Sequence, residues 1–269
     1  DNLNKYFSSY YKIFNDQKMV STLDDYNKDK PPATFSIPDI DHKPSEYTAD
    51  CYSILMDLCA LGNLKKMYIP RSIDNSKSLK QNQTLYEQQV GRNLKVGKGS
   101  RILEIGSGCG RIAYDMSKFT GSDVYGINID SEQIKDAKKF TKKKKTNKLH
   151  FVFSDLNDKQ PFEDNFFDGI YEFGAFTSFI TNFESVFKEM FRILKPGGIF
   201  FISDAVLLDD FTRENKYHLE LLKNSRMVMA GGVFVHYKYI EKYAKDAGFN
   251  ILSSKGGTFP NLAQELPLL

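Results

Sequence analysis

The chain has 269 residues, of which 41% are hydrophobic, and its 37 Lys and Arg nearly balance its 34 Asp and Glu. The small net charge of +3 argues against nucleic acid or another polyanion as a partner. No apolar run reaches the ~18 residues of a membrane-spanning helix, and the three cysteines lack metal-type spacing. We therefore expect a cytoplasmic protein in a reducing compartment, with no metal site.

The first part of the chain predicts an N-terminal arm and helical cap over residues 1–94. The chain begins with Asp1 instead of Met, so we expect that it has been trimmed and that a targeting segment could have preceded it. Four prolines between residues 31 and 44 predict an irregular arm. Apolar residues at helical spacing predict a helix over residues 45–61, capped by Gly62, and a second helix over residues 84–94.

The stretch from Arg101 to Arg111 combines a strand pattern with a glycine-rich turn. Residues 101–105 form an apolar run typical of a buried strand, and Gly106, Gly108 and Gly110 let the backbone turn sharply before a helix. Such a turn points backbone N–H groups at a crevice beyond the strand. Arg111 stands where the dinucleotide fingerprint requires glycine, which argues against NAD.

Strand and helix patterns alternate after residue 101. We expect further strands at residues 123–127, 149–153, 167–171, 199–203 and 250–253, separated by helices that begin near Ser131 and cover residues 183–194 and 239–247. This alternation predicts an α/β fold with a Rossmann-like, doubly wound, mainly parallel sheet. Its core covers residues 95–206, residues 207–236 are an inserted lid, and residues 237–269 complete the core.

Several motifs at the expected strand ends resemble those of class I S-adenosylmethionine-dependent methyltransferases. Glu104-Ile-Gly-Ser-Gly-Cys-Gly110 resembles the first motif, and the family's residue for the ribose hydroxyls falls at Asn128, with Gln133 as its neighbour. Asp155 falls where the family binds the adenine amino group. The resemblance implies S-adenosylmethionine as the cofactor and the following contacts: Glu104, Gly106, Ser107, Gly108, Gly110, Asn128, Ile129, Gln133, Asp155, Leu156 and Glu172.

Within this class the chain is most similar to the sterol methyltransferases, over roughly residues 45 to 260. The segments 52–58, 119–121 and 126–133 carry the resemblance. Of the family's aromatic segment only Gly62 is present, and residues 173–178 lack the Glu and His of the corresponding family stretch. The resemblance implies a bulky apolar acceptor, a sterol first of all, methylated at a side-chain carbon or at the ring carbon next to the 3-oxygen.

Candidate catalytic acids and bases lie at the ends of the fourth and fifth strands and in the insertion. They are Tyr171, Glu172, Asp204 and His236, with His218 as a further candidate, and for both histidines an ordinary structural role is the main alternative. A phosphobase or other small-molecule N- or O-methyltransferase is the second hypothesis, since the insertion carries Arg213, Lys216, Lys223 and Arg226. A cofactor-binding pseudoenzyme is the third hypothesis.

Two surface features concern partners and the ends of the chain. The lysine-rich stretch 138–148 is typical of a solvated helix end, and the alternative is peripheral contact with an anionic membrane such as that of the endoplasmic reticulum. Glycines and prolines after residue 255 disfavour a last long strand, so we expect a truncated chain. The oligomeric state stays open. We expect the arm, the first helix and the insertion to pack over the strand ends as an aromatic cap with Tyr52, Tyr68, Phe211, Tyr217 and Phe234.

Overall fold

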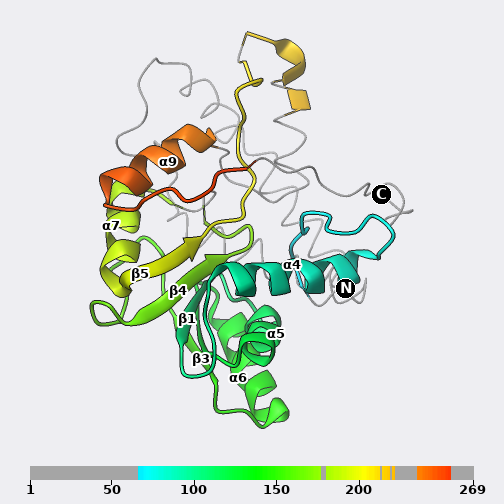
Figure 1. The fold of residues 1–269 in the computed structure, drawn as a ribbon, viewed down its shortest axis with the longest axis vertical. Helices are drawn as coiled ribbons and strands as arrows, with labels where there is room; N and C mark the ends of the chain where they lie inside the picture. The colour runs from blue at the N-terminus through cyan, green and yellow to red at the C-terminus, as the bar shows by residue number, and fades with distance from the viewer. Residues whose placement is uncertain (1–65, 177–179, 213, 219, 222–234, 256–269) are drawn as a thin grey trace.

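The computed structural model describes residues 66–176, 180–212, 214–218, 220–221 and 235–255. Within these residues the centre is a sheet of parallel strands in the order β3-β2-β1-β4-β5 (Figure 1). The chain order reverses between β1 and β4, and open α/β sheets bind ligands beyond the carboxyl ends of the strands at such a reversal. The strands are β1 (Arg101–Ile105), β2 (Asp123–Asn128), β3 (Leu149–Phe153), β4 (Phe167–Glu172) and β5 (Leu194–Phe201).

Helices cover both faces of the sheet, which confirms the doubly wound α/β fold. One buried cluster joins the sheet to α4, α5 and α6, and the other joins it to α7 and α9. Strand β1 shows why both faces are covered, because Ile102 lies in one cluster and Leu103 in the other, as the two-residue period of a strand requires. The helices are α4 (Leu79–Asn93), α5 (Arg111–Thr120), α6 (Ser131–Lys144), α7 (Phe183–Ile193) and α9 (Tyr237–Asp246).

Helix α4 begins at Leu79, ahead of the expected start at residue 84. A capping box explains this start: the Ser78 side chain accepts a hydrogen bond from the Gln81 backbone, and the Gln81 side chain accepts one from the Ser78 backbone. Val90 on this helix is completely buried in the cluster that also contains Ile102 of β1. The structure thus packs this part of the expected N-terminal unit directly on the sheet.

Strand β5 begins at Leu194, whereas we expected a helix up to this residue and a strand only from residue 199. A register irregularity lies opposite, between Phe167 and Gly169 of β4. Pro196 lies in the segment between the paired residues Leu194 and Ile199, where the ladder to β4 is interrupted and a proline is tolerated. The expected start of this strand at residue 199 was therefore wrong, and the residues before it form an irregular part of the strand with Gly197 at a φ of 78°.

The expected strand at residues 250–253 is absent from the structure. These residues pair with no strand in the described part of the chain, and Leu252 is 77% exposed. A strand needs a neighbour for its backbone groups, and nothing in the short apolar pattern specifies one.

The ends of the expected insertion meet. Leu207 and His236 form a parallel bridge, and the Leu207 N–H donates to the Val235 carbonyl at 2.9 Å. The insertion thus leaves and re-enters the fold at one place, while residues 222–234 lie outside the described part, as does the expected helix 45–61. No helix among the described residues has both the length and the apolar character needed to cross a membrane.

Candidate functional site

The glycine loop between β1 and α5 is the centre of the candidate site. Gly106, Gly108 and Gly110 have φ angles of 68°, 50° and 73°, a region that side-chain-bearing residues rarely occupy. A Cβ on Gly106 would lie 2.3 Å from the Cβ of Ala175, so the loop after β1 lies directly against the loop after β4. The structure thereby places the glycines at the reversal of strand order, where the sequence predicted a ligand crevice.

Two residues from β2 and α6 contact this loop. The Gly108 N–H donates to Asn128 Oδ1 at 3.4 Å, and Asn128 Nδ2 donates to Gln133 Oε1 at 3.2 Å. Gln133 lies in the first turn of α6, where Asp130 caps the helix and accepts from the Gln133 N–H. The structure brings together Gly108, Asn128 and Gln133, as the sequence predicted. Ile129, the next residue after Asn128, is half-buried.

Gly110 has a packing reason of its own. A Cβ there would lie 2.5 Å from the ring of Phe151 on β3, and the residue begins α5 as its N-terminal cap. The third glycine of the motif is therefore required by the approach of helix and sheet, independently of any cofactor contact.

Unpartnered polar atoms around the glycine loop test whether a polar cofactor fits. Within the described residues, Glu104 Oε2, Ser107 Oγ and Gln133 Nε2 are buried and have no hydrogen-bond partner. Buried polar groups normally find partners, so donors and acceptors of this kind fit a ligand with amino, carboxylate and hydroxyl groups. Burial, together with the nearby charge of Glu87, raises the pKa of Glu104 well above its ordinary value.

Glu172, at the end of β4, holds two loops together. Its carboxylate is completely buried and accepts hydrogen bonds from the Ala175 N–H at 2.8 Å and from the Ser203 N–H. Burial and the neighbouring Asp204 raise its pKa well above the ordinary value. Asp204 in turn accepts from the Phe176 N–H at 3.1 Å. Glu172 therefore joins the loops after β4 and β5, and Asp204 lies beside it with a hydrogen bond to the first of these loops.

The other catalytic candidates, Tyr171, His236 and His218, are held in place by neighbouring protein groups. Tyr171 is completely buried beside Glu104, and burial raises its pKa well above the ordinary value. His236 caps α9 through the Lys238 N–H, and its Nε2 lies 3.4 Å from Asp209 Oδ1. His218 accepts from the Thr212 N–H at 3.1 Å and lies against the ring of Phe211. The contacts of both histidines are thus with the insertion and its borders.

The adenine candidate Asp155 follows β3 in a loop held by many hydrogen bonds. Its Oδ1 accepts from both the backbone N–H and the side-chain Nδ2 of Asn157, each at 2.9 Å. Leu156 is buried in the core cluster that contains Ile127 of β2. The loop therefore presents a carboxylate near the strand ends and anchors itself by an apolar side chain.

An N-terminal segment contributes residues to the site that the strand motifs do not indicate. Tyr68 stacks on Phe173, just beyond β4, with ring centroids 4.8 Å apart, and its hydroxyl donates to Glu87 Oε1 at 2.7 Å. Lys66 Nζ contacts the same carboxylate at 2.6 Å. The polar pattern of residues 63–82 gives no signal for these contacts.

The predicted aromatic cap is described only in part. Tyr68 lies at the strand ends as predicted, whereas Tyr217 is 64% exposed and Phe211 contacts His218. Tyr52 and Phe234 lie outside the described residues. The packing of the whole cap stays a prediction.

Residues 96–254, more than half of the chain, match the family model described as a methyltransferase domain. The chain belongs to this family. It is of the class I S-adenosylmethionine-dependent type, close to the sterol methyltransferases, and S-adenosylmethionine is the cofactor that its site residues fit. No group of three or more His, Cys, Asp or Glu in the described residues is arranged to hold a metal ion.

A curated relative supports the sterol likeness. The sterol 24-C-methyltransferase of Schizosaccharomyces pombe is 30% identical over 202 residues, which cover 75% of this chain and 53% of that protein. The sterol 24-C-methyltransferase of Saccharomyces cerevisiae is matched over 55% of its length. This methyltransferase thus spans about half the length of the curated relatives it matches.

Solved structures show the same fold at low sequence identity. The [4+2]-cyclase SpnF superposes with a TM-score of 0.65 at 18% identity, covering 78% of this chain and 74% of that one. Geranyl diphosphate C-methyltransferase from Streptomyces coelicolor gives a TM-score of 0.62 at 14% identity, covering 77% and 79%. Because a cyclase and a methyltransferase share this fold, the fold alone does not decide the acceptor.

Proposed function

We propose that this methyltransferase transfers the methyl group of S-adenosylmethionine to a carbon of a sterol or a similarly bulky apolar small molecule. The observation that carries the proposal is the similarity to a sterol 24-C-methyltransferase over three-quarters of the chain. The stacked pair of Tyr68 and Phe173 supports it, because it places apolar surface beside the loop that contacts Gly106.

The cofactor supplies an electrophilic methyl group, so the protein contributes mainly position and exclusion of water. The glycine loop, with Asn128 and Gln133, holds the shape of the cofactor cradle. Glu172 keeps the loops after β4 and β5 in place beside it. The stacked rings of Tyr68 and Phe173, which we call the aromatic wall, lie beside the loop after β4.

The position that is methylated decides what else the site must provide. Alkylation of a side-chain double bond builds a carbocation, which aromatic faces stabilise and a base then deprotonates. Attack from a ring carbon next to the 3-oxygen passes through an enol-like nucleophile. The aromatic wall suits both routes, and Asp204, half-buried after β5, is the carboxylate that we assign as the candidate base.

Incubation with S-adenosylmethionine carrying a labelled methyl group tests the proposal. The acceptors are sterols with a side-chain double bond, 3-keto sterols and phosphoethanolamine. We expect label in the sterol fraction, with its position read by mass spectrometry, and only background label with the Gly108→Ala variant. Label confined to phosphoethanolamine would overturn the sterol assignment. Tight binding of S-adenosylhomocysteine without turnover of any acceptor would identify a cofactor-binding pseudoenzyme instead.

A further inference from the structure

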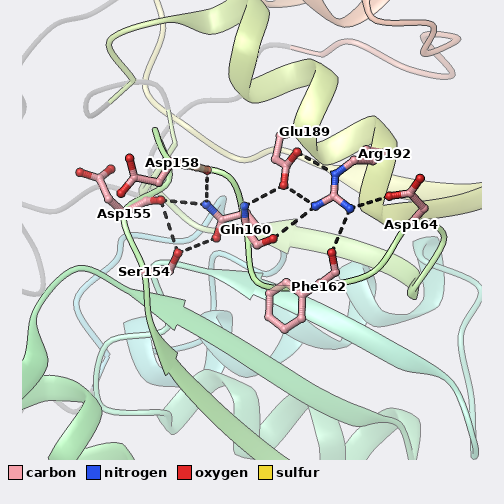
Figure 2. A network of polar contacts seen from close by, with 8 residues as sticks. All are labelled: Ser154, Asp155, Asp158, Gln160, Phe162, Asp164, Glu189 and Arg192. Atoms are coloured by element: carbon pink, nitrogen blue, oxygen red, sulfur yellow. Dashed lines mark hydrogen bonds and ion pairs between the residues drawn. The ribbon is translucent and has the colours of Figure 1, made fainter.

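The loop that follows β3, residues 154–160, is organised around the buried side chain of Gln160. Residues 154–160 contain no helix or strand, yet Gln160 is only 2% exposed. Figure 2 shows that its polar groups point back into the loop that carries Asp155. A loop without ladder hydrogen bonds needs such a side chain to satisfy its backbone groups.

Gln160 uses both of its side-chain donors and its side-chain oxygen on this loop. Its Nε2 donates to the carbonyls of Asp155 and Asp158, each at 2.8 Å, and its Oε1 accepts from Ser154 Oγ at 2.9 Å. The carbonyl oxygen of Asp155 is therefore fixed from one side, while Asn157 fixes its carboxylate from the other. Gln160 thus fixes the backbone from which the Asp155 side chain projects, and Asn157 then fixes the carboxylate on that backbone.

The backbone of Gln160 is anchored to α7. Its N–H donates to Glu189 Oε1 at 2.7 Å, and Arg192 donates to the same carboxylate and to the Gln160 carbonyl. Burial acts to raise the pKa of Glu189, but the hydrogen bonds from Arg192 and Gln160 outweigh it and hold the value below the ordinary one. The Glu189 carboxylate thus stays charged and keeps its hydrogen bonds to Arg192 and to the Gln160 backbone.

We propose that Gln160 is a positioning residue that sets the direction of the Asp155 carboxylate and so determines how strongly the site prefers adenine to a purine without the amino group. The proposal rests on the assignment of Asp155 to the adenine amino group, and it is independent of the methyl acceptor. Without the Gln160 amide, the carbonyls of Asp155 and Asp158 would lose a hydrogen-bond donor. The loop therefore needs this particular side chain to keep its shape.

Calorimetry with two cofactor products tests the role of Gln160. S-adenosylhomocysteine carries the amino group, whereas S-inosylhomocysteine has an oxygen in its place. We expect Gln160→Leu to weaken S-adenosylhomocysteine binding about tenfold, the loss of roughly one hydrogen bond, and to change S-inosylhomocysteine binding less than about twofold. In an Asp155→Ala background the substitution should have no further effect on either ligand.

Two additional variants keep the test decisive. Ser154→Ala removes the donor to Gln160 Oε1 together with a long contact of 3.5 Å to the Asp155 carbonyl, so it should produce a smaller loss of the same kind even where Gln160→Leu does not fold. Lys159→Ala changes an exposed neighbour and should bind as the wild type does. Equal weakening of both ligands, a loss that persists without Asp155, or a wild type that does not distinguish the ligands would each overturn the proposal. Because no acceptor is present, failure here leaves the sterol assignment unaffected.

Discussion

At the scale of single residues, the site depends on glycines for two different reasons. Gly108 has a left-handed φ of 50°, and a Cβ added to it would lie 3.3 Å from Gln133 Oε1, so a side chain would meet the cradle itself. Gly99 has a φ of 89°, and a Cβ added to it would find no described atom within 4 Å, so a side chain there would meet only backbone strain. A comparison of Gly108 with Gly99 therefore separates the free-energy cost of backbone strain from the cost of placing a side chain in the cofactor cradle.

Gly108→Ala should therefore lose both stability and cofactor binding, whereas Gly99→Ala should lose stability alone. Each substitution places a Cβ in the left-handed region, at a cost of about 1–2 kcal/mol in the free energy of unfolding. Only Gly108→Ala should weaken S-adenosylhomocysteine binding, by at least about tenfold. Urea denaturation and calorimetry measure the two effects, and equal affinities in both variants would contradict the assigned role of Gly108.

The buried carboxyl of Glu104 gives a prediction about pH. Its pKa is raised by burial in the folded protein, so the folded state retains a proton that the unfolded state has released above the ordinary value near 4.5. Its contribution to stability is therefore present at low pH and is lost as the pH rises, with a slope of up to about 1.4 kcal/mol per pH unit. Glu104→Gln, which cannot titrate, should show a flatter dependence of the free energy of unfolding on pH.

Urea denaturation at several pH values above 4.5 measures this slope. Glu163→Gln, at an exposed position, serves as the control and should keep the wild-type slope. Parallel curves for Glu104→Gln and the wild type would show that Glu104 releases its proton equally in both states.

At the scale of elements, ion pairs join the segment around Lys66 to α4 and α5, and the pair with Glu87 is buried. Lys66 Nζ lies 2.6 Å from Glu87 Oε2 and 2.9 Å from Asp115 Oδ2. Burial acts to lower the pKa of Lys66, but the two carboxylates outweigh it and raise the value, so the ammonium stays charged. Tyr68 follows in the same segment, and this ion pair therefore fixes the aromatic wall relative to the sheet.

Lys66→Met should destabilise the protein by about 3 kcal/mol, because it leaves Glu87 buried without its cation. The double variant Lys66→Met, Glu87→Gln should recover a large part of that loss, since the uncompensated charge is gone. Lys139→Met removes an exposed pair with Asp136, which solvent screens, and should cost far less than Lys66→Met. Urea denaturation compares the three, and equal losses for Lys66→Met and Lys139→Met would contradict a buried role for Lys66.

At the scale of the whole molecule, cofactor binding and folding are linked through the strand ends. Gly106 after β1, Asn128 ending β2 and the loop after β4 come from separate parts of the chain and meet only in the folded sheet. A ligand that binds this arrangement therefore stabilises the folded state alone.

S-adenosylhomocysteine at about 100 times its dissociation constant should raise the free energy of unfolding by about 2.7 kcal/mol. The same concentration should raise it less for Gly108→Ala, whose affinity is weaker, and the same amount for Gly99→Ala. Unfolding in urea with and without the ligand measures the shift. No stabilisation of the wild type would contradict the cofactor assignment.

Local patterns in the sequence predicted the parallel sheet, the glycine loop and most helix positions. Glycines at positive φ and apolar alternation are local requirements, so Gly106, Gly108 and β1 are readable from a few neighbouring residues. The start of α4 was also encoded locally, in the capping box of Ser78 and Gln81, although the helix pattern alone placed it later. The family motifs indicated Asn128 and Gln133, which the fold brings together.

Tertiary structure alone decided the contacts between distant segments. Tyr68 meets Phe173, Lys66 meets Glu87, and Gln160 meets Glu189, each pair separated by many residues with no periodic signal between them. Whether an apolar stretch becomes a strand also depends on a neighbour, which is why β5 extends to Leu194 whereas residues 250–253 pair with no strand that the structure describes. Backbone conformation is chosen locally, but hydrogen-bond partners and burial are supplied by the rest of the fold.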